Sequence, residues 1–193
     1  MRDAMRKGLI EGTSIKLDFP SRPRPRMVED NPVFLNFRIQ SQQQINWCWA
    51  AVTTSICLYY NRSSSVSQCS MANSQLGQTT CCADGSTDAC NRGFNTPDAL
   101  QSNSNLRESA SGMASRQRVI DEVVSGTPPC MRIQWPDQST HAVVIQGFFI
   151  LLGGDFLVHV EDPFYGHQEY FPENELYHSY GRWIATFFTK SAA

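Results

Sequence analysis

Three short segments of this sequence carry the side chains that nucleophilic catalysis requires. Cys48 lies between Trp47 and Trp49, His141 precedes an apolar run that begins at Ala142, and Asp162 ends another apolar run. A cysteine attacks a carbonyl carbon only when a base takes its proton, and the base needs a third group that orients it. Together the three side chains predict acyl transfer through a covalent intermediate.

Cys48 is predicted to lie in the first turn of a helix that spans residues 47–60. Apolar residues recur at helical spacing, and Asn46 is a suitable N-cap, which would make Cys48 the second helical residue. Free backbone N–H groups and the positive end of the helix dipole favour a thiolate at that position. The alternative is a buried structural cysteine between two tryptophans.

His141 and Asp162 are predicted to meet at one end of an antiparallel strand pair, formed by residues 142–148 and 156–161. A two-residue turn at Gly153-Gly154 would place Asp162 opposite Ile145, four residues from His141. Direct opposition of Asp162 and His141 needs either a longer loop over residues 149–155 or a bulge, and we expect the longer loop.

The other histidines are weaker candidates for the base. His159 lies in the middle of a predicted strand and is expected to pack, whereas His167 and His178 are expected at the surface. Glu161 points to the opposite face of its strand from Asp162. Taken alone, a histidine such as His141 is more often structural, so the case depends on all three segments together.

The remaining elements predict an α+β domain with a mostly antiparallel sheet, because helices come first in the chain and strands later. A short helix begins at Thr96-Pro97, with Thr96 as its cap, and a longer one covers 115–126. Strands are predicted at residues 33–40, 130–135, 142–149, 156–160, 167–171 and 182–189. Residues 1–32 form a basic Pro/Arg-rich tail or pro-segment, and residues 33–193 form the domain, with a helical, cysteine-rich part at 33–126 and a sheet part at 127–193.

The three segments resemble, in the same order, those of papain-like cysteine peptidases. The resemblance is to the bacterial branch that includes bacteriocin leader peptidases and plant-pathogen effector proteases, and it implies a papain-like fold. It implies Cys48 as nucleophile, His141 as base and Asp162 as the orienting group. The glutamine six residues before the cysteine, Gln42, would bind the oxyanion together with the Cys48 backbone N–H. Gln43 and Gln44 compete for this role by type, although only Gln42 has the family spacing.

The sequence departs from the plant enzymes of that family in three ways. The third member is an aspartate rather than an asparagine, and only 93 residues separate Cys48 from His141. No tryptophan corresponds to the one that shields the triad in the plant enzymes.

Seven cysteines leave one thiol over if the others pair. With Cys48 as the free nucleophile, three disulfides are expected among Cys57, Cys69, Cys81, Cys82, Cys90 and Cys130, with adjacent Cys81 and Cys82 bonding different partners. Six reduced thiols are the alternative. No Cys-x-x-Cys occurs, and no histidine flanks the group at zinc spacing, so we expect no metal and no cofactor.

Charge and hydropathy limit the partners. The 193 residues hold 16 Lys and Arg against 18 Asp and Glu, a net charge of −2, which gives no reason to expect nucleic acid as a partner. No apolar run reaches the length of a membrane span, and the N-terminus lacks the apolar region of a secretory signal. We expect a monomer that acts on a protein or peptide substrate, with a cognate inhibitor or immunity protein as a further partner. Secretion or delivery by a specialised bacterial route fits, and a cytosolic location is the alternative.

Three functions fit these residues. The first is a papain-like endopeptidase that uses a Cys-His-Asp triad, and a secreted or injected effector or toxin is the form of it that the resemblance implies. The second uses the same triad for deamidation or acyl transfer on a protein, since the acyl-enzyme is common to these reactions. The third is a disulfide-stabilised interaction module without activity, in which Cys48 is disulfide-bonded or His141 lies far from it.

Overall fold

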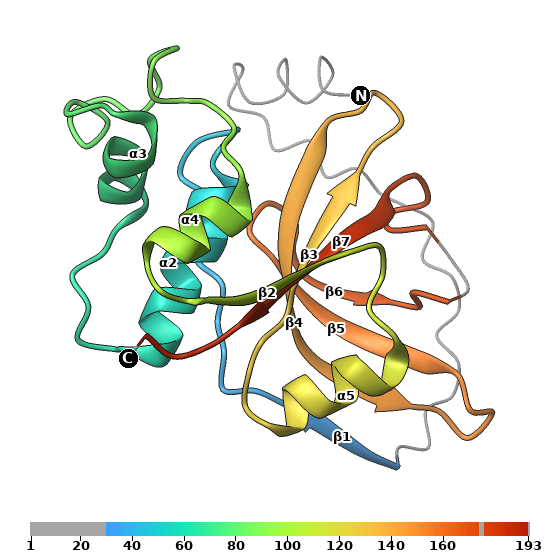
Figure 1. The fold of residues 1–193 in the computed structure, drawn as a ribbon. Coiled ribbons are helices and arrows are strands. Elements are labelled where there is room, and N and C mark those ends of the chain that lie inside the picture. The colour runs from blue at the N-terminus through green and yellow to red at the C-terminus, as the bar shows by residue number, and fades with distance from the viewer. Residues whose placement is uncertain (1–29, 174–175, 193) are drawn as a thin grey trace.

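The computed structural model describes residues 30–173 and 176–192, and in this part of the chain helices and an antiparallel sheet lie side by side (Figure 1). The helices are α2 (Cys48–Tyr60), α3 (Gln68–Leu76), α4 (Thr96–Ser102) and α5 (Arg116–Val124). The strands are β1 (Asp30–Phe34), β2 (Leu106–Ser111), β3 (Cys130–Gln134), β4 (Thr140–Ile150), β5 (Phe156–Asp162), β6 (Gly166–Tyr170) and β7 (Arg182–Thr189). The α+β class and the mostly antiparallel sheet are confirmed.

The sheet has the strand order β2-β7-β3-β4-β5-β6, and β1 also pairs with β4. Every pairing is antiparallel. Strand β4 is the longest and contacts β1, β3 and β5, so it is the central strand of the sheet. His141 lies near the start of β4 and is therefore attached to a rigid element.

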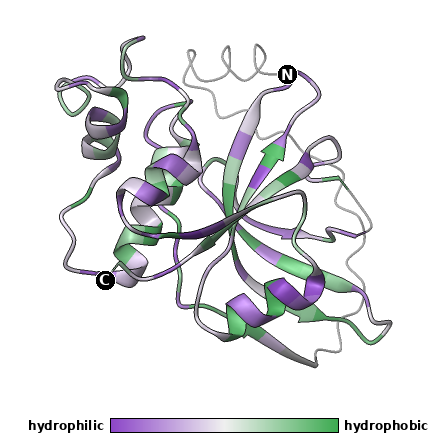
Figure 2. Cartoon of the chain, in the orientation of Figure 1, coloured by the Kyte–Doolittle hydropathy of each residue, from purple (hydrophilic) through white to green (hydrophobic). Residues whose placement is uncertain are grey.

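Two hydrophobic clusters hold the fold together. The larger fills the space between the sheet and the helices α2 and α5, whereas the smaller surrounds Trp47 and Trp49 and includes Cys81 and Cys90. Figure 2 shows hydrophobic residues along the strands of the sheet and on α2, and a more mixed character around α3. The helical side therefore has less apolar surface to bury than the sheet side has.

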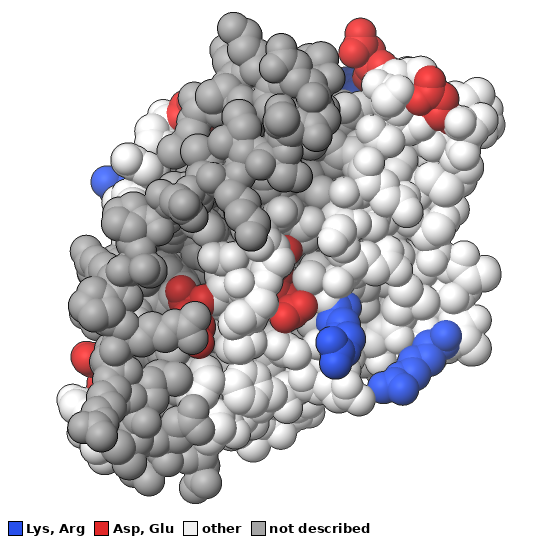
Figure 3. All heavy atoms as spheres, turned by 180° about the vertical axis from the view of Figure 1, so that it is seen from behind, with Lys and Arg blue, Asp and Glu red and all other residues white. Residues whose placement is uncertain are grey.

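The surface seen from behind carries few charges. Figure 3 shows isolated Lys and Arg side chains and scattered Asp and Glu side chains among uncharged residues, with no large cluster of either sign on the described part of that face. Among the described residues, no helix is both long and apolar enough to cross a membrane.

Helix α2 begins one residue later than the sequence predicts. Its N-cap is Trp47, which makes no side-chain capping bond, so Cys48 is the first rather than the second helical residue. The predicted cap, Asn46, instead donates from its side chain to the Asn91 carbonyl and accepts nothing from the helix. The thiol still lies where backbone N–H groups are free.

Other boundaries also differ from the prediction. The cap of α4 is Asn95, and Thr96 is already helical; helix α5 begins after Ser115, whose side chain caps it. Helix α3 and strand β2 were not predicted. The predicted strand 33–40 is β1 at 30–34, followed by an irregular stretch, so residues 30–32 belong to the sheet. The rest of the predicted tail lies outside the described residues.

The register of β4 and β5 lies between the two alternatives considered above. Ile150 pairs with Phe156 and Val144 with Glu161, with a shift between Ile145 and Gly147. Asp162 therefore falls level with Val143. The expected position, directly opposite His141, is wrong by two residues. The cause is a loop shorter than expected, because Ile150 still pairs with Phe156. The extra residue in β4, a bulge, then brings Asp162 one position closer to His141.

The cysteines form two disulfides rather than three. Cys69 bonds Cys82 and Cys81 bonds Cys90, so the adjacent pair does take different partners. Cys48, Cys57 and Cys130 are free thiols. The expected third bridge is absent because Cys57 and Cys130 lie in different hydrophobic clusters, where each packs as a small apolar side chain.

Candidate active site

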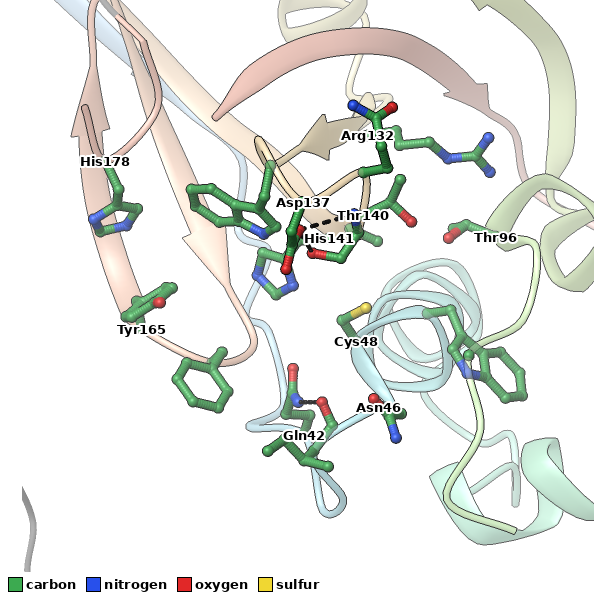
Figure 4. A pocket seen from close by; sticks show the side chains of 18 of the residues that line it. Gln42, Asn46, Cys48, Thr96, Arg132, Asp137, Thr140, His141, Tyr165 and His178 are labelled. Carbon is green, nitrogen blue, oxygen red and sulfur yellow. Dashed lines mark hydrogen bonds between the residues drawn. The ribbon is translucent and has the colours of Figure 1, made fainter. Parts of the chain in front are cut away.

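A cavity of about 620 Å³ opens where the start of α2 faces the sheet (Figure 4). Cys48 and His141 both line it. Its walls are largely aromatic and include Trp49, Phe94, Trp135 and Tyr165. A mostly apolar hollow with a few polar groups at its floor is the usual form of a binding site for a small molecule or peptide side chain.

Cys48 is placed at the floor by the first turn of α2. Burial raises the pKa of its thiol, but a hydrogen bond to His141 and the charge of that ring lower it. The backbone N–H groups of Ala142 and Trp49 lower the pKa further, so it lies below the ordinary value. The environment therefore favours the thiolate, which is the nucleophilic form.

His141 lies between Cys48 and Asp162. Its Nε2–H donates to Asp162 Oδ1 over 2.8 Å, which leaves Nδ1 as the nitrogen available to the thiol. Burial lowers the pKa of the imidazole, but the charge and hydrogen bond of Asp162, together with Cys48, raise it to about 10. A low thiol pKa beside a high imidazole pKa favours a thiolate–imidazolium pair at neutral pH.

Asp162 is almost completely buried and fully hydrogen-bonded. Its Oδ1 accepts from the backbone N–H groups of Phe164 (2.7 Å) and Tyr165 (3.0 Å), and its Oδ2 accepts from the Tyr177 hydroxyl (2.8 Å). Burial raises the pKa of this carboxyl, but His141 and the two backbone N–H groups lower it below its usual range. The aspartate is thus held as a carboxylate in a fixed orientation.

Gln42 is the one of the three glutamines that lines the cavity. Its side-chain nitrogen donates to the carbonyls of Gln44 (2.9 Å) and Ile45 (2.8 Å), which closes the loop before α2. Its Oε1 is buried and has no hydrogen-bond partner among the described residues. In this arrangement the amide N–H groups point at backbone, so an oxyanion contact requires the amide to turn.

Three residues of this region were not predicted from the sequence. Tyr177 donates to Asp162, Trp135 forms part of the cavity wall, and His178 also lines the cavity and lies beside the Tyr165 ring, with 4.4 Å between centroids. His178 was expected at the surface and is half-buried instead. All three lie in or near loops, where no periodic pattern marks which side chains turn inward.

The other histidines and Glu161 lie away from this cavity. His167 is exposed, as expected, and His159 packs against Phe34 with 4.7 Å between ring centroids. Glu161 accepts from the Ile39 N–H on the face of β5 opposite to Asp162. The structure therefore brings together Cys48, His141, Asp162 and Gln42, and of the competing side chains only His178 lines the same cavity.

A free cysteine at the start of a helix, beside a histidine and an aspartate on a facing antiparallel sheet, is the arrangement of papain-like cysteine peptidases. The chain belongs to the family described as papain-like cysteine protease AvrRpt2, whose profile matches residues 29–173. It is therefore a bacterial-type cysteine peptidase, a thiol hydrolase with a papain-like fold, as the sequence predicted.

Two further comparisons were made. No curated protein matches the chain. Among solved structures, the chain is similar to the crystal structure of a double glycine motif protease from an AMS/PCAT transporter in complex with the leader peptide. The two share 21% identity with a TM-score of 0.48, over 83% of this chain and 99% of that one.

Proposed function

We propose that the protein is an endopeptidase in which Cys48 is the nucleophile, His141 the general base and acid, and Asp162 the group that orients the imidazole. The observation that carries this proposal is the buried His141 ring, which interacts with Cys48 on one side and donates to Asp162 on the other. Both Cys48 and His141 face the cavity, so a substrate carbonyl can reach the sulfur.

The reaction follows from this geometry. The Cys48 thiolate adds to the carbonyl carbon of the scissile peptide bond, and the carbonyl oxygen becomes an oxyanion. The His141 imidazolium then gives its Nδ1 proton to the leaving amine, the C–N bond breaks, and a thioester remains. A water molecule gives a proton to His141 and adds to the thioester, the C–S bond breaks, and the acid is released with the thiolate–imidazolium pair restored.

The oxyanion would be bound by the Cys48 backbone N–H and by the Gln42 side chain. Cys48 is the first residue of α2, and the first N–H groups of a helix have no partner within it. Gln42 can contribute once its amide turns and one N–H leaves the carbonyl of Gln44 or Ile45. Gln42→Ala should then lower kcat by about 10²–10³-fold if the amide serves the oxyanion. A small change in kcat would mean that Gln42 only closes the loop.

The nucleophile is tested by native-state alkylation and by substitution. Iodoacetamide should modify Cys48 alone in the folded protein, because burial raises the pKa of Cys57 to about 11 and holds that of Cys130 far above its usual range. Modification and Cys48→Ala should each abolish cleavage of a denatured protein substrate, while Cys57→Ala serves as the matched thiol control and stays active. A Cys48→Ala variant with full activity would refute the proposal.

The choice between proteolysis and the other acyl-transfer reactions depends on the acceptor of the acyl group. Mass spectrometry of a trapped target separates them, because deamidation adds about 1 Da to an intact chain and proteolysis cuts it. Two observations favour an active enzyme over the inactive interaction module. Cys48 is in neither disulfide and interacts directly with His141.

We further propose that the protein is a bacterial effector, secreted or delivered by a specialised route, that acts on a protein target as a monomer. Its membership of the AvrRpt2 family and its two disulfides, which favour an oxidising compartment during folding, support this. Immunoblotting of cells and medium from a producing bacterium tests export, and retention of all protein in the cells would contradict it. The basic Pro/Arg-rich arm before β1 would be a pro-segment removed by self-cleavage, and identical N-termini of wild-type and Cys48→Ala proteins would refute that part.

A further inference from the structure

Three side chains with metal-binding groups converge on the hairpin of β5 and β6. His159 and Glu161 lie two residues apart on β5 and so share one face of the sheet. His167 on β6 pairs directly with Glu161 and lies on that same face. One ligand atom from each of the three residues lies within 4.8 Å of the other two.

This group is separate from the active site. Side chains alternate along a strand, so Glu161 and its neighbours face away from Asp162 and the cavity. His159 packs at its outer edge against Phe34, with 4.7 Å between ring centroids, and stacks on His167, with 3.4 Å between centroids. None of the three residues lines the cavity that holds Cys48.

The polar atoms of the group are poorly satisfied as they stand. His159 Nδ1 is buried and has no hydrogen-bond partner among the described residues. Glu161 Oε1 lies 3.8 Å from His167 Nδ1, which is too far for a hydrogen bond. A buried nitrogen without a hydrogen-bond partner costs free energy, and a bound ligand at this group would remove that cost.

We propose that His159, Glu161 and His167 bind one divalent transition metal ion, with Zn²⁺ as the best fit. Two imidazoles and a carboxylate are ligands that zinc takes readily, and three protein ligands leave a fourth position for water. Tetrahedral zinc places its ligand atoms about 3.3 Å apart, since each Zn–N or Zn–O bond is about 2.0–2.1 Å. The ligand atoms must therefore close by about 1.5 Å at most, and the stacked imidazole rings must rotate apart.

The surroundings already orient one of these ligands. Glu161 Oε2 accepts the backbone N–H of Ile39 over 3.2 Å, which leaves Oε1 directed toward His167. A second hydrogen bond of this kind is typical of ligating carboxylates. A bound ion would join β5 to β6 and, through Glu161, to the segment that leads from β1 to Gln42. The cysteine spacings alone gave no sign of such a site.

The test is calorimetric titration of metal-free protein with ZnCl₂, on the full chain without an affinity tag, in a Cys48→Ala background. That background is needed because the Cys48 thiolate and His141 could bind zinc themselves. We expect one Zn²⁺ per chain. His167→Phe should weaken binding by at least about 100-fold, since loss of even an outer-shell partner costs 10–100-fold. Glu161→Gln should weaken it in the same direction.

The matched control is His178→Phe in the same background, which removes a histidine that lines the active-site cavity and is not part of the proposed site, and it should leave the Kd unchanged. His167 is exposed, so its substitution should leave the fold intact, and thermal unfolding without metal checks this. Excess Zn²⁺ should raise the Tm of the Cys48→Ala protein but not of its His167→Phe derivative. Absence of stoichiometric binding, equal affinity in the His167→Phe protein, or loss of binding in the His178→Phe control would each overturn the proposal.

Discussion

The two walls of the active-site cavity are held in place by different means. On the sheet side, His141 and Asp162 project from β4 and β5, whose neighbouring residues are buried in the large cluster. On the helical side, Cys48 lies between Trp47 and Trp49, whose indole N–H groups donate to the carbonyls of Cys90 and Arg92. Here a small cluster and two disulfides do what strand pairing does on the other side.

This difference shows how a domain with little apolar material on one side can still hold a nucleophile beside its base. The disulfides reduce the conformational freedom of a polar segment. The indoles of Trp47 and Trp49 bind to that segment, so both neighbours of Cys48 are held in place. Gly85 makes close packing possible, because a Cβ there would lie 2.7 Å from the Trp47 ring. Four experiments separate the two walls.

Asp162→Ala disrupts the sheet side of the cavity and should have the largest effect on kcat/KM. Loss of the carboxylate removes the group that orients the imidazole and stabilises the imidazolium, so kcat/KM should fall by about 10³–10⁴-fold. The Tyr177 hydroxyl and two backbone N–H groups also lose their acceptor, which destabilises the fold by about 1–3 kcal/mol or more. Steady-state kinetics and urea unfolding measure both, with Asp155→Ala, an exposed residue of the β4–β5 loop, as control. A variant within tenfold of wild type would contradict the role of Asp162.

Removal of the Cys81–Cys90 disulfide should destabilise the helical side of the cavity. The double variant Cys81→Ser, Cys90→Ser opens a loop with a sequence separation of 9, which the loop-entropy relation values at about 2–3 kcal/mol. We expect a loss of that size in the free energy of unfolding, measured by urea titration, and a weaker activity from a less constrained Cys48. Ala89→Ser, in the same loop, is the control. Unchanged stability would show that the small cluster holds this wall without the bridge.

Trp47→Phe weakens the same wall at a single hydrogen bond. The variant leaves the buried Cys90 carbonyl without its indole donor, 2.7 Å away in the wild type, and should cost about 1–2 kcal/mol. Trp49→Phe should cost less, because the carbonyl it loses belongs to Arg92, which is exposed and can bind water. Equal costs in denaturant titrations would argue against this distinction.

The pH dependence of kcat/KM should be set by the Cys48–His141 pair and not by the disulfide-bonded segment. The active pair needs Cys48 ionised and His141 protonated, so kcat/KM should rise as pH increases through the lowered pKa of Cys48. It should fall again as pH approaches the His141 pKa of about 10. The Cys81→Ser, Cys90→Ser variant should show the same two limbs at a lower plateau. Limbs displaced by a full pH unit would mean that the disulfide also tunes the pair.

The features that the sequence could predict are those with a local pattern. Helix α2 follows from its apolar spacing, and β4 and β5 follow from their apolar runs, so Cys48, His141 and Asp162 could be placed on the right elements. The polar helix α3 has too few apolar residues to show a face, and only its Ser67 capping box marks it. The sequence-based prediction therefore worked best where burial dictates residue type.

The features that could not be predicted depend on contacts between distant segments. The β-bulge in β4 shifts the register of Asp162 by one position, and the adjacent Gly147 alone does not show that a bulge forms there. Tyr177 reaches Asp162 across 15 residues of chain, through a turn without periodicity. The count of seven cysteines suggested three bridges, but Cys57 and Cys130 are free thiols buried in different hydrophobic clusters, and a count alone cannot show that.

The hydrogen bond from Tyr177 to Asp162 bears on how this site could change in evolution. A carboxylate here accepts from four donors, whereas an asparagine would bring two N–H groups of its own. The amide could keep its oxygen toward His141 and the two backbone N–H groups only if its nitrogen faced Tyr177 and the hydroxyl reversed to accept. An exchange between aspartate and asparagine is therefore open to this scaffold by one rotation of a hydroxyl. Replacement of Tyr177 by an obligate donor such as tryptophan would close that route.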